Sequence, residues 1–428
     1  MIVLLVLLVS GLALYSYFNN KRLENSDSDK DDSGTIVDNN LGVLNETLST
    51  CPSDLSGMLT HEIFDMNDLD YSMPLGMLAP GGHTIPTDHM CLAHMGQKRI
   101  PIYAPGDVTI VFMDDKMTYD AQTDVLLHDD YSVEIALCRG LSVSLNHFSE
   151  ISPEIEAAWA ASEKQCDAGQ YHFGTDMSTY YSPCQSYFQK GLKAGDLMGY
   201  IGTFEGGTVT LSTAIDFGAY NFNSEPLAFA NPSRYSDYNL HAMCGLDLFT
   251  EELRTEYYGK LAYIEHNISS GQPEVILRVG EPLCGETMQD ISGTLQGNWF
   301  AGNPGIGSNS TEYMMALVHN ITNYSIPEIS LEGQTELGGN ISFNFTAMHI
   351  GAINREFSEV TPGEQIYCYQ DVIVGGSGTQ LDKKGNPVDE SAPKYLIRLV
   401  DETHLQIEKK AGVCGVNEEF ASPFTYER

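Results

Sequence analysis

Short apolar alternations, separated by turn residues, constrain the fold of this chain more than any other feature. Within residues 69–253 they recur between glycines, prolines and aspartates, as in residues 100–112 and 131–137. A period of two places successive side chains on opposite faces of a strand. The 40 glycines and 23 tyrosines of the chain also suit strands that are joined by tight turns. The sequence therefore predicts a mostly β protein.

Two segments depart from this pattern and are predicted to be helices. Residues 153–164 follow Ser152, a residue type that caps helix N-termini, and they place Ile155 and Trp159 on one face. A second helix is predicted near residues 248–258. The first helix and most of the second fall inside a first domain, residues 69–255.

The C-terminal part, residues 284–428, is predicted to be a small antiparallel β-barrel or sandwich of its own. Residues 340–346 alternate, and residues 394–400 can pair with residues 404–408 across a turn. The tripeptide Gly-Asn-Trp at 297–299 is similar to the G-x-W that opens lipocalin-like barrels. This similarity implies a lipocalin-like form for the domain.

The first 50 residues are not assigned to either domain. Residues 2–18 form one apolar run, so segment 1–18 fits either an uncleaved membrane anchor or the core of a signal peptide. Residues 19–50 are polar and acidic and are predicted to be a disordered linker. Lys21 and Arg22 follow the apolar run, and by itself this charge asymmetry favours a cytoplasmic C-terminus.

Cysteines and glycosylation sequons favour export. The nine cysteines include no C-x-x-C pair, which disfavours zinc ribbons and predicts disulfides in an oxidising compartment. The predicted pairs are Cys166–Cys184, Cys368–Cys414 and Cys244–Cys284. Sequons of the type N-x-S/T, which mark exposed and glycosylated loops of a secreted protein, begin at Asn45, Asn267, Asn309, Asn320, Asn323, Asn340 and Asn344. The predicted location is extracellular or at the cell surface.

The charge of the chain narrows the choice of partners. Its 58 acidic and 22 basic residues give a formal net charge of −36. Such a surface repels nucleic acid and anionic lipid headgroups. Membrane contact is therefore predicted only through the N-terminal segment. The predicted partner is a peptide, a glycan or a cell-envelope protein, and the oligomeric state stays undefined.

Four segments, in order, carry a resemblance to a peptidase family. They are Gly-His-Thr-Ile-Pro-Thr-Asp at 82–88, Pro-Ile-Tyr-Ala-Pro-Gly-Asp-Val-Thr-Ile-Val at 101–111, Val-Ser-Leu-Asn-His-Phe-Ser at 143–149, and Leu-Lys-Ala-Gly-Asp-Leu-Met-Gly-Tyr-Ile-Gly at 192–202 followed by Ala-Ile-Asp-Phe at 214–217. Their order and spacing resemble the M23, or lysostaphin-like, zinc metallopeptidases. The resemblance implies a duplicated-hybrid-motif-like β-sheet domain.

The resemblance also implies a zinc site, with part of the family's set altered. His83 and Asp88 match the first two metal ligands, five positions apart where the family has four. His147 matches a catalytic histidine. The H-x-H motif is replaced, with Ala214 at its first position and Asp216 at the ligand position. Three protein ligands and an open position would lower the pKa of a zinc-bound water towards neutrality.

Other histidines offer alternatives. His241 follows closely enough in sequence to substitute for the catalytic histidine that Ala214 replaces, and His89 and His94 are further candidate ligands. A lone histidine in a β protein is more often a hydrogen-bonded structural residue, and this interpretation stays open for all three.

Three functions follow from these observations. The first is an exported cell-envelope protein whose altered M23-like domain binds a peptide, glycan or protein rather than cleaving it efficiently. The second is an active zinc endopeptidase with His83, Asp88 and Asp216 as ligands and His147 as base. The third is a purely structural cell-surface protein.

Overall fold

The protein is mostly β in the part of the chain that the structure describes. The computed structural model describes residues 47–80, 82–96, 98–167, 169–171, 177–202, 213–266, 273–301, 314–333, 335–371, 373–374, 380–381 and 391–428. The predicted anchor or signal segment and residues 19–46 of the predicted linker lie outside these residues. Within them, no helix has the length and apolar character that a membrane crossing requires.

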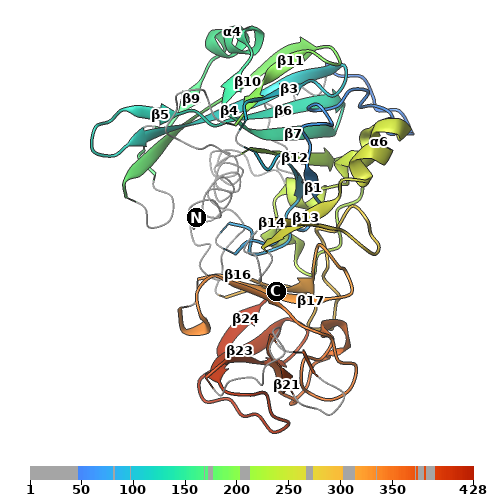
Figure 1. The fold of residues 1–428 in the computed structure, drawn as a ribbon, viewed down its shortest axis with the longest axis vertical. Coiled ribbons are helices and arrows are strands. Elements are labelled where there is room, and N and C mark those ends of the chain that lie inside the picture. The colour runs from blue at the N-terminus through green and yellow to red at the C-terminus, as the bar shows by residue number, and fades with distance from the viewer. Residues whose placement is uncertain are drawn as a thin grey trace, which may run out of the picture.

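A nine-stranded antiparallel sheet forms the first half of the fold, in blue to green at the top of Figure 1. In spatial order its strands are β1 (Tyr71–Met73), β2 (His89–Ala93), β12 (Ala214–Asn221), β7 (Leu141–Phe148), β6 (Tyr131–Cys138), β4 (Val108–Asp120), β10 (Thr179–Leu192) and β9 (Gln165–Cys166), and β5 (Leu126–His128) pairs with β4. Apolar side chains on its covered face form the main core, from Leu59 to Cys284. The predicted alternation therefore marks real strands.

A three-stranded sheet packs beside it, with the order β3 (Ile100–Tyr103), β11 (Leu197–Ile201) and β8 (Glu150–Ile151). The segment 100–112 is thus two strands in different sheets. The Ala-Pro-Gly-Asp turn at 104–107 separates them, because proline cannot donate a ladder hydrogen bond and glycine permits a sharp bend. A further hairpin joins β13 (Ala262–His266) to β14 (Pro273–Leu277).

The helices are short. The predicted first helix is α4 (Pro153–Ala161), and the Ser152 side chain accepts a hydrogen bond from the Ile155 amide, as its capping role requires. The predicted second helix is α6 (Glu251–Tyr258), which begins later than expected because Leu248 belongs to a 3₁₀ turn, η2 (Gly245–Leu248). The remaining ones are α5 (Asp237–Leu240), η1 (Pro232–Arg234), η4 (Thr335–Leu337) and η5 (Phe357–Glu359).

The C-terminal part is a curled antiparallel sheet of eight strands, orange to red in Figure 1. The order is β18 (Ile341–Asn344), β17 (Pro327–Leu331), β16 (Met314–His319), β15 (Gly297–Phe300), β24 (Phe424–Glu427), β23 (His404–Ala411), β22 (Pro393–Leu399) and β19 (Tyr367–Tyr369), and β20 (Ile373–Val374) pairs with β21 (Gln380–Leu381). The predicted hairpin is β22 with β23. Trp299 is fully buried in the core of this sheet, with the Arg428 guanidinium 4.0 Å from its ring centroid.

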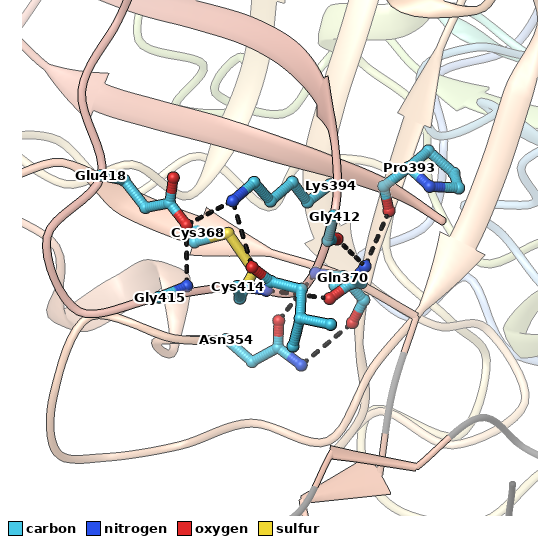
Figure 2. Close-up of a disulfide and its surroundings, with 10 residues drawn as sticks. Asn354, Cys368, Gln370, Pro393, Lys394, Gly412, Cys414, Gly415 and Glu418 are labelled. Carbon is cyan, nitrogen blue, oxygen red and sulfur yellow. Dashed lines mark hydrogen bonds and ion pairs between the residues drawn. A yellow bond between two sulfur atoms is a disulfide. The ribbon is translucent and has the colours of Figure 1, made fainter. Parts of the chain in front are cut away.

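A disulfide and the buried side-chain amide of Gln370 attach the loop after β23 to the edge of this sheet at β19 (Figure 2). Cys368 on β19 is bonded to Cys414. The side chain of Gln370 donates to the carbonyls of Pro393 and Gly412 and accepts from the Cys414 amide. The loop after β23 is therefore attached both covalently and by hydrogen bonds.

Four disulfides hold the described chain together. The three predicted pairs are present, and Cys51–Cys138 is a fourth that the sequence did not suggest. Cys91 on β2 is buried and is the one free cysteine of the nine, all of which are described. Four disulfides indicate folding in an oxidising environment.

The two β parts share an interface. Leu78 and Ile85, in the loop between β1 and β2, pack against Ala316 and Val318 on β16. The Thr84 hydroxyl in the same loop donates to the carboxylate of Glu332, which follows β17. The C-terminal sheet thus covers the loop that carries His83.

Candidate functional site

Three neighbouring strands of the large sheet bring together the residues that the sequence singled out. In the ladder, Asp216 on β12 pairs with Cys91 on β2 on one side and with Asn146 on β7 on the other. His89 lies two residues before Cys91, so it projects from the same face of β2. His147 follows Asn146 directly. The sheet therefore gathers these side chains around Asp216.

His83 reaches the same place from the loop between β1 and β2. Its amide donates to the carbonyl of Ala79 over 2.8 Å, which closes a tight turn. Its ring centroid lies 5.3 Å from that of His89, with the ring planes inclined by 58°. Both rings are buried, and the Nε2 atoms of both lack a hydrogen-bond partner.

Asp88 is already engaged on both of its carboxylate oxygens. Its Oδ1 lies 2.8 Å from Nδ1 of His89, and its Oδ2 accepts a hydrogen bond of 2.9 Å from the Asn239 amide group. This arrangement fixes the His89 ring and directs its Nε2 atom towards Asp216, whose Oδ2 lies 3.7 Å away.

His147 lies between two carboxylates. Its Nε2 atom is 3.0 Å from Oδ2 of Asp216, and its Nδ1 atom is 3.2 Å from Oδ1 of Asp130. The His147 backbone has φ of 78°, in the left-handed region that few residues other than glycine adopt. The strained backbone turns the imidazole towards the cluster, and such strain is often found at functional positions.

Burial and charge set the pKa values of this cluster. Burial lowers the pKa of His147, but Asp130 and Asp216 outweigh it and raise the pKa to about 10. Burial would raise the pKa of Asp216, yet His147 and His89 hold it well below its ordinary value. Burial lowers the pKa of His83 to about 3, because this ring lacks a carboxylate of its own. Burial lowers the pKa of His89, but Asp216 and Asp88 outweigh it and raise the pKa above its ordinary value. His147 and His89 are therefore the cations of the cluster, and His83 is a neutral imidazole.

The structure places His83, Asp88, His147 and Asp216 close to one another. The candidate ligand His89 is at the centre of the cluster as well. His241 ends α5, and its ring packs against Phe222 with a centroid distance of 5.5 Å and an angle of 52° between the ring planes.

The remaining candidate ligand, His94, has partners outside the cluster. The His94 ring lies at the end of β2, where Nδ1 is 2.9 Å from Oδ2 of Asp70 and 3.0 Å from the Asp68 carbonyl. His94 thus has a complete local environment of its own, which fits the structural interpretation.

Sequence reasoning missed Asp130, Cys91 and Asn239. Asp130 closes the turn before β6, in the run His-Asp-Asp at 128–130, and this acidic turn before a strand was the available signal. The Cys91 thiol hydrogen-bonds Asp216, and burial raises its pKa well above the ordinary range. Nothing in the local sequence indicated Asn239, because a short helix brings it to Asp88 from a distant part of the chain.

The donor types of the cluster suit zinc, which binds imidazole nitrogen and carboxylate oxygen. Two buried imidazole nitrogens without partners, beside a carboxylate, are also what a metal ion would satisfy. In the described part of the chain, however, no group of three or more His, Cys, Asp or Glu side chains is placed so that it could hold a metal ion. The residue types suit a metal, and their placement in this structure does not.

Comparisons with known proteins give no relative. No protein-family model, no curated protein and no solved structure matches the chain.

Proposed function

We propose that this chain is an exported cell-envelope protein whose M23-like domain binds a peptide, a glycan or another envelope protein instead of cleaving it efficiently. The observation that carries the proposal is the burial of the cluster. The exposed fractions are 2% for Asp216, 3% for His89 and 6% for His83 and Asp88. A hydrolytic centre needs an open position at which water and the scissile bond meet.

The cover over the cluster has identifiable parts. The loop with His83 packs on the C-terminal sheet through Leu78 and Ile85, and Thr84 is tied to Glu332. The hydroxyl of Thr287 donates to the carbonyl of Thr87 over 2.8 Å and holds the other end of the loop. These contacts support a closed cluster that stabilises the domain.

The residue at 214 supports the same conclusion. In the resemblance, this position holds a histidine that assists the transition state, and here a buried alanine occupies it. An alanine cannot donate a proton or a hydrogen bond to a developing oxyanion. Loss of such a group costs catalytic rate more than it costs binding.

Four disulfides agree with the export part of the proposal, since they form and persist outside the reducing cytoplasm.

The alternative of an active zinc endopeptidase has one observation in its favour, the placement of His147 beside Asp216. The alternative of a purely structural protein rests on the contacts of Leu78, Ile85 and Thr84 with the C-terminal sheet.

The test uses the zinc-supplemented full chain with a cross-bridge peptide and with soluble glycan fragments from cell envelopes. Hydrolysis is followed by mass spectrometry and binding by fluorescence anisotropy, each for the wild type and for His147→Ala. We expect binding without hydrolysis above the His147→Ala level. Hydrolysis that depends on His147 would establish the endopeptidase, and the absence of both would favour the structural protein.

A further inference from the structure

The large sheet has an arm that extends beyond its other strands. β4 and β10 pair along almost their whole length, whereas β6 pairs with β4 only from Thr109 to Asp115. The rest of β4, with β10 on one side and β5 on the other, forms the arm, which projects at the upper left of Figure 1. Within the described residues β5 pairs with β4 alone, so its second edge has no strand partner. Backbone groups on that edge are available to an extended segment of another chain.

Four large apolar side chains at the end of this arm are exposed: Val125 (56%), Leu126 (44%), Leu127 (39%) and Met177 (64%). We call these four residues the arm tip. The two chain segments that carry them are neighbours, because the Ala121 amide donates to the Ser178 carbonyl over 3.0 Å. A single exposed apolar side chain needs no explanation, but several together indicate a surface that binds another molecule.

The turn that carries the arm tip is held by side-chain contacts. The Asp120 carboxylate accepts from both the amide and the hydroxyl of Thr123, each over 2.8 Å. The Tyr180 hydroxyl donates to Asp124, and the Tyr180 ring stacks on Tyr119 with a centroid distance of 5.2 Å and an angle of 14° between the ring planes. A surface that is already ordered loses little conformational entropy when a partner binds.

Negative charge lies beside the arm tip. Asp120 ends β4 and Asp124 lies in the turn that follows, and hydrogen bonds from Thr123 hold the pKa of Asp120 below its ordinary value. Residues 117–131 and 177–189 contain no lysine or arginine. Lys116, which precedes the first of these segments, is only 3% exposed. The arm tip therefore combines apolar side chains with carboxylates that no basic residue of these two segments neutralises.

We propose that the arm tip is a docking surface for a segment of another protein that carries lysine or arginine beside apolar side chains. Apolar contact supplies the affinity, and opposite charges steer the encounter and select the partner. A second copy of this chain fits poorly, because it would bring Asp120 and Asp124 against the same carboxylates. The proposal goes beyond the proposed function and does not depend on it, since the arm tip shares no residue with the cluster around Asp216.

The test measures the binding of a synthetic probe to the full chain. The probe is a short fluorescein-labelled peptide in which lysine and leucine alternate, and its binding is followed by fluorescence anisotropy at physiological salt. We expect the double variant of Leu126→Ser with Leu127→Ser to bind it roughly 10–100-fold more weakly, because two apolar contacts are lost. Asp124→Asn keeps an acceptor for Tyr180 and removes the charge, so we expect a loss of roughly 2–5-fold. Ile350→Ser, at an 85% exposed position in the C-terminal part, is the matched control and keeps the wild-type affinity.

Further measurements separate the proposal from its competitors. Equal affinity of the wild type and the double variant would overturn it, and so would equally tight binding of a peptide with serine in place of leucine. Binding of the wild type to neutral phosphatidylcholine vesicles instead of the probe, lost in the double variant, would assign the arm tip to a lipid surface. A dimer in analytical ultracentrifugation that the double variant abolishes would assign it to a second copy. If circular dichroism shows that the double variant does not fold, Met177→Ser on the neighbouring segment takes its place.

Discussion

The Nε2 nitrogen of His147 lies 3.0 Å from the Oδ2 oxygen of Asp216 on the adjacent strand, while its Nδ1 nitrogen faces Asp130. One imidazole thus contacts two carboxylates in a region with little exposure to solvent. Buried charges are tolerated when they are paired and hydrogen-bonded. His147 provides that compensation for both aspartates.

Replacement of His147 by alanine should therefore destabilise the metal-free protein. The change leaves two carboxylates without their partner, and breaking a buried pair in this way costs about 3–5 kcal/mol. Urea unfolding at pH 6, followed by circular dichroism in the presence of a chelator, measures the loss. His404→Ala is the control, because that ring pairs with Asp401 at the surface and its removal should have no measurable effect.

The contribution of His147 to the stability of the folded protein should depend on pH. Because the pKa of His147 is raised to about 10 in the folded state from 6.5, the stabilisation is fully present below pH 6.5 and is lost as the pH rises to 10. The difference between wild type and His147→Ala should shrink over this range. A difference that stays constant from pH 6 to pH 10 would contradict the role of His147 as a cation of the cluster.

The stability of the protein should also depend on pH through Asp115 on β4, a buried acid that no cation compensates. Burial, with Asp129 beside it, raises its pKa to about 8. Its contribution to stability is therefore greatest below the unfolded value of 3.8 and is lost as the pH rises to 8. Asp115→Asn should become more stable than the wild type by roughly 5 kcal/mol at pH 8 and should differ little at pH 4. Glu364→Gln, at a surface position, is the matched control.

Thr84 should control how firmly the His83 loop is held. Thr84→Val keeps the shape of the side chain and removes the donor to Glu332, so we expect a loss of about 1 kcal/mol. Hydrogen–deuterium exchange should become faster at residues 76–88 and stay unchanged in β22 and β23. Equal exchange in wild type and variant would show that the apolar contacts of Leu78 and Ile85 hold the loop unaided.

Cys91 should be the single reactive thiol of the unfolded protein. Eight of the nine cysteines are in disulfides, and the Cys91 side chain is buried on β2. Thiol titration should give about zero groups per native chain and one in denaturant. Cys91→Ser should reduce the second number to zero. Two or more thiols in denaturant would show that one disulfide does not form.

Local patterns predicted much of the secondary structure. The helix after Ser152, the hairpin of β22 and β23 and the strands of the large sheet follow from apolar periodicity and turn residues, which act over a few positions. The split of residues 100–112 was missed because alternation continues through the turn at 104–107. Three disulfides could be predicted from short loop lengths, whereas Cys51–Cys138 joins residues 87 positions apart.

Candidate site residues could be named from the sequence only where they fall within a motif. His83, Asp88, His147 and Asp216 come from segments with recognisable spacing. Asp130 and Asn239 could not be found, because their contacts depend on strand register and on the packing of α5, which long-range folding decides. The contacts of Glu332 and β16 with the loop over the cluster could not be predicted either, because residues 284–428 were predicted to form a separate domain.

The bond between Cys51 and Cys138 has a mechanical consequence. Cys51 lies near the start of the described chain, and Cys138 ends β6, a central strand of the large sheet. Tension that arrives along the chain before Cys51 passes through the sulfur atoms into β6. Because β6 has a hydrogen-bonded neighbour on each side, this force would enter the sheet at an interior strand and not at an edge strand.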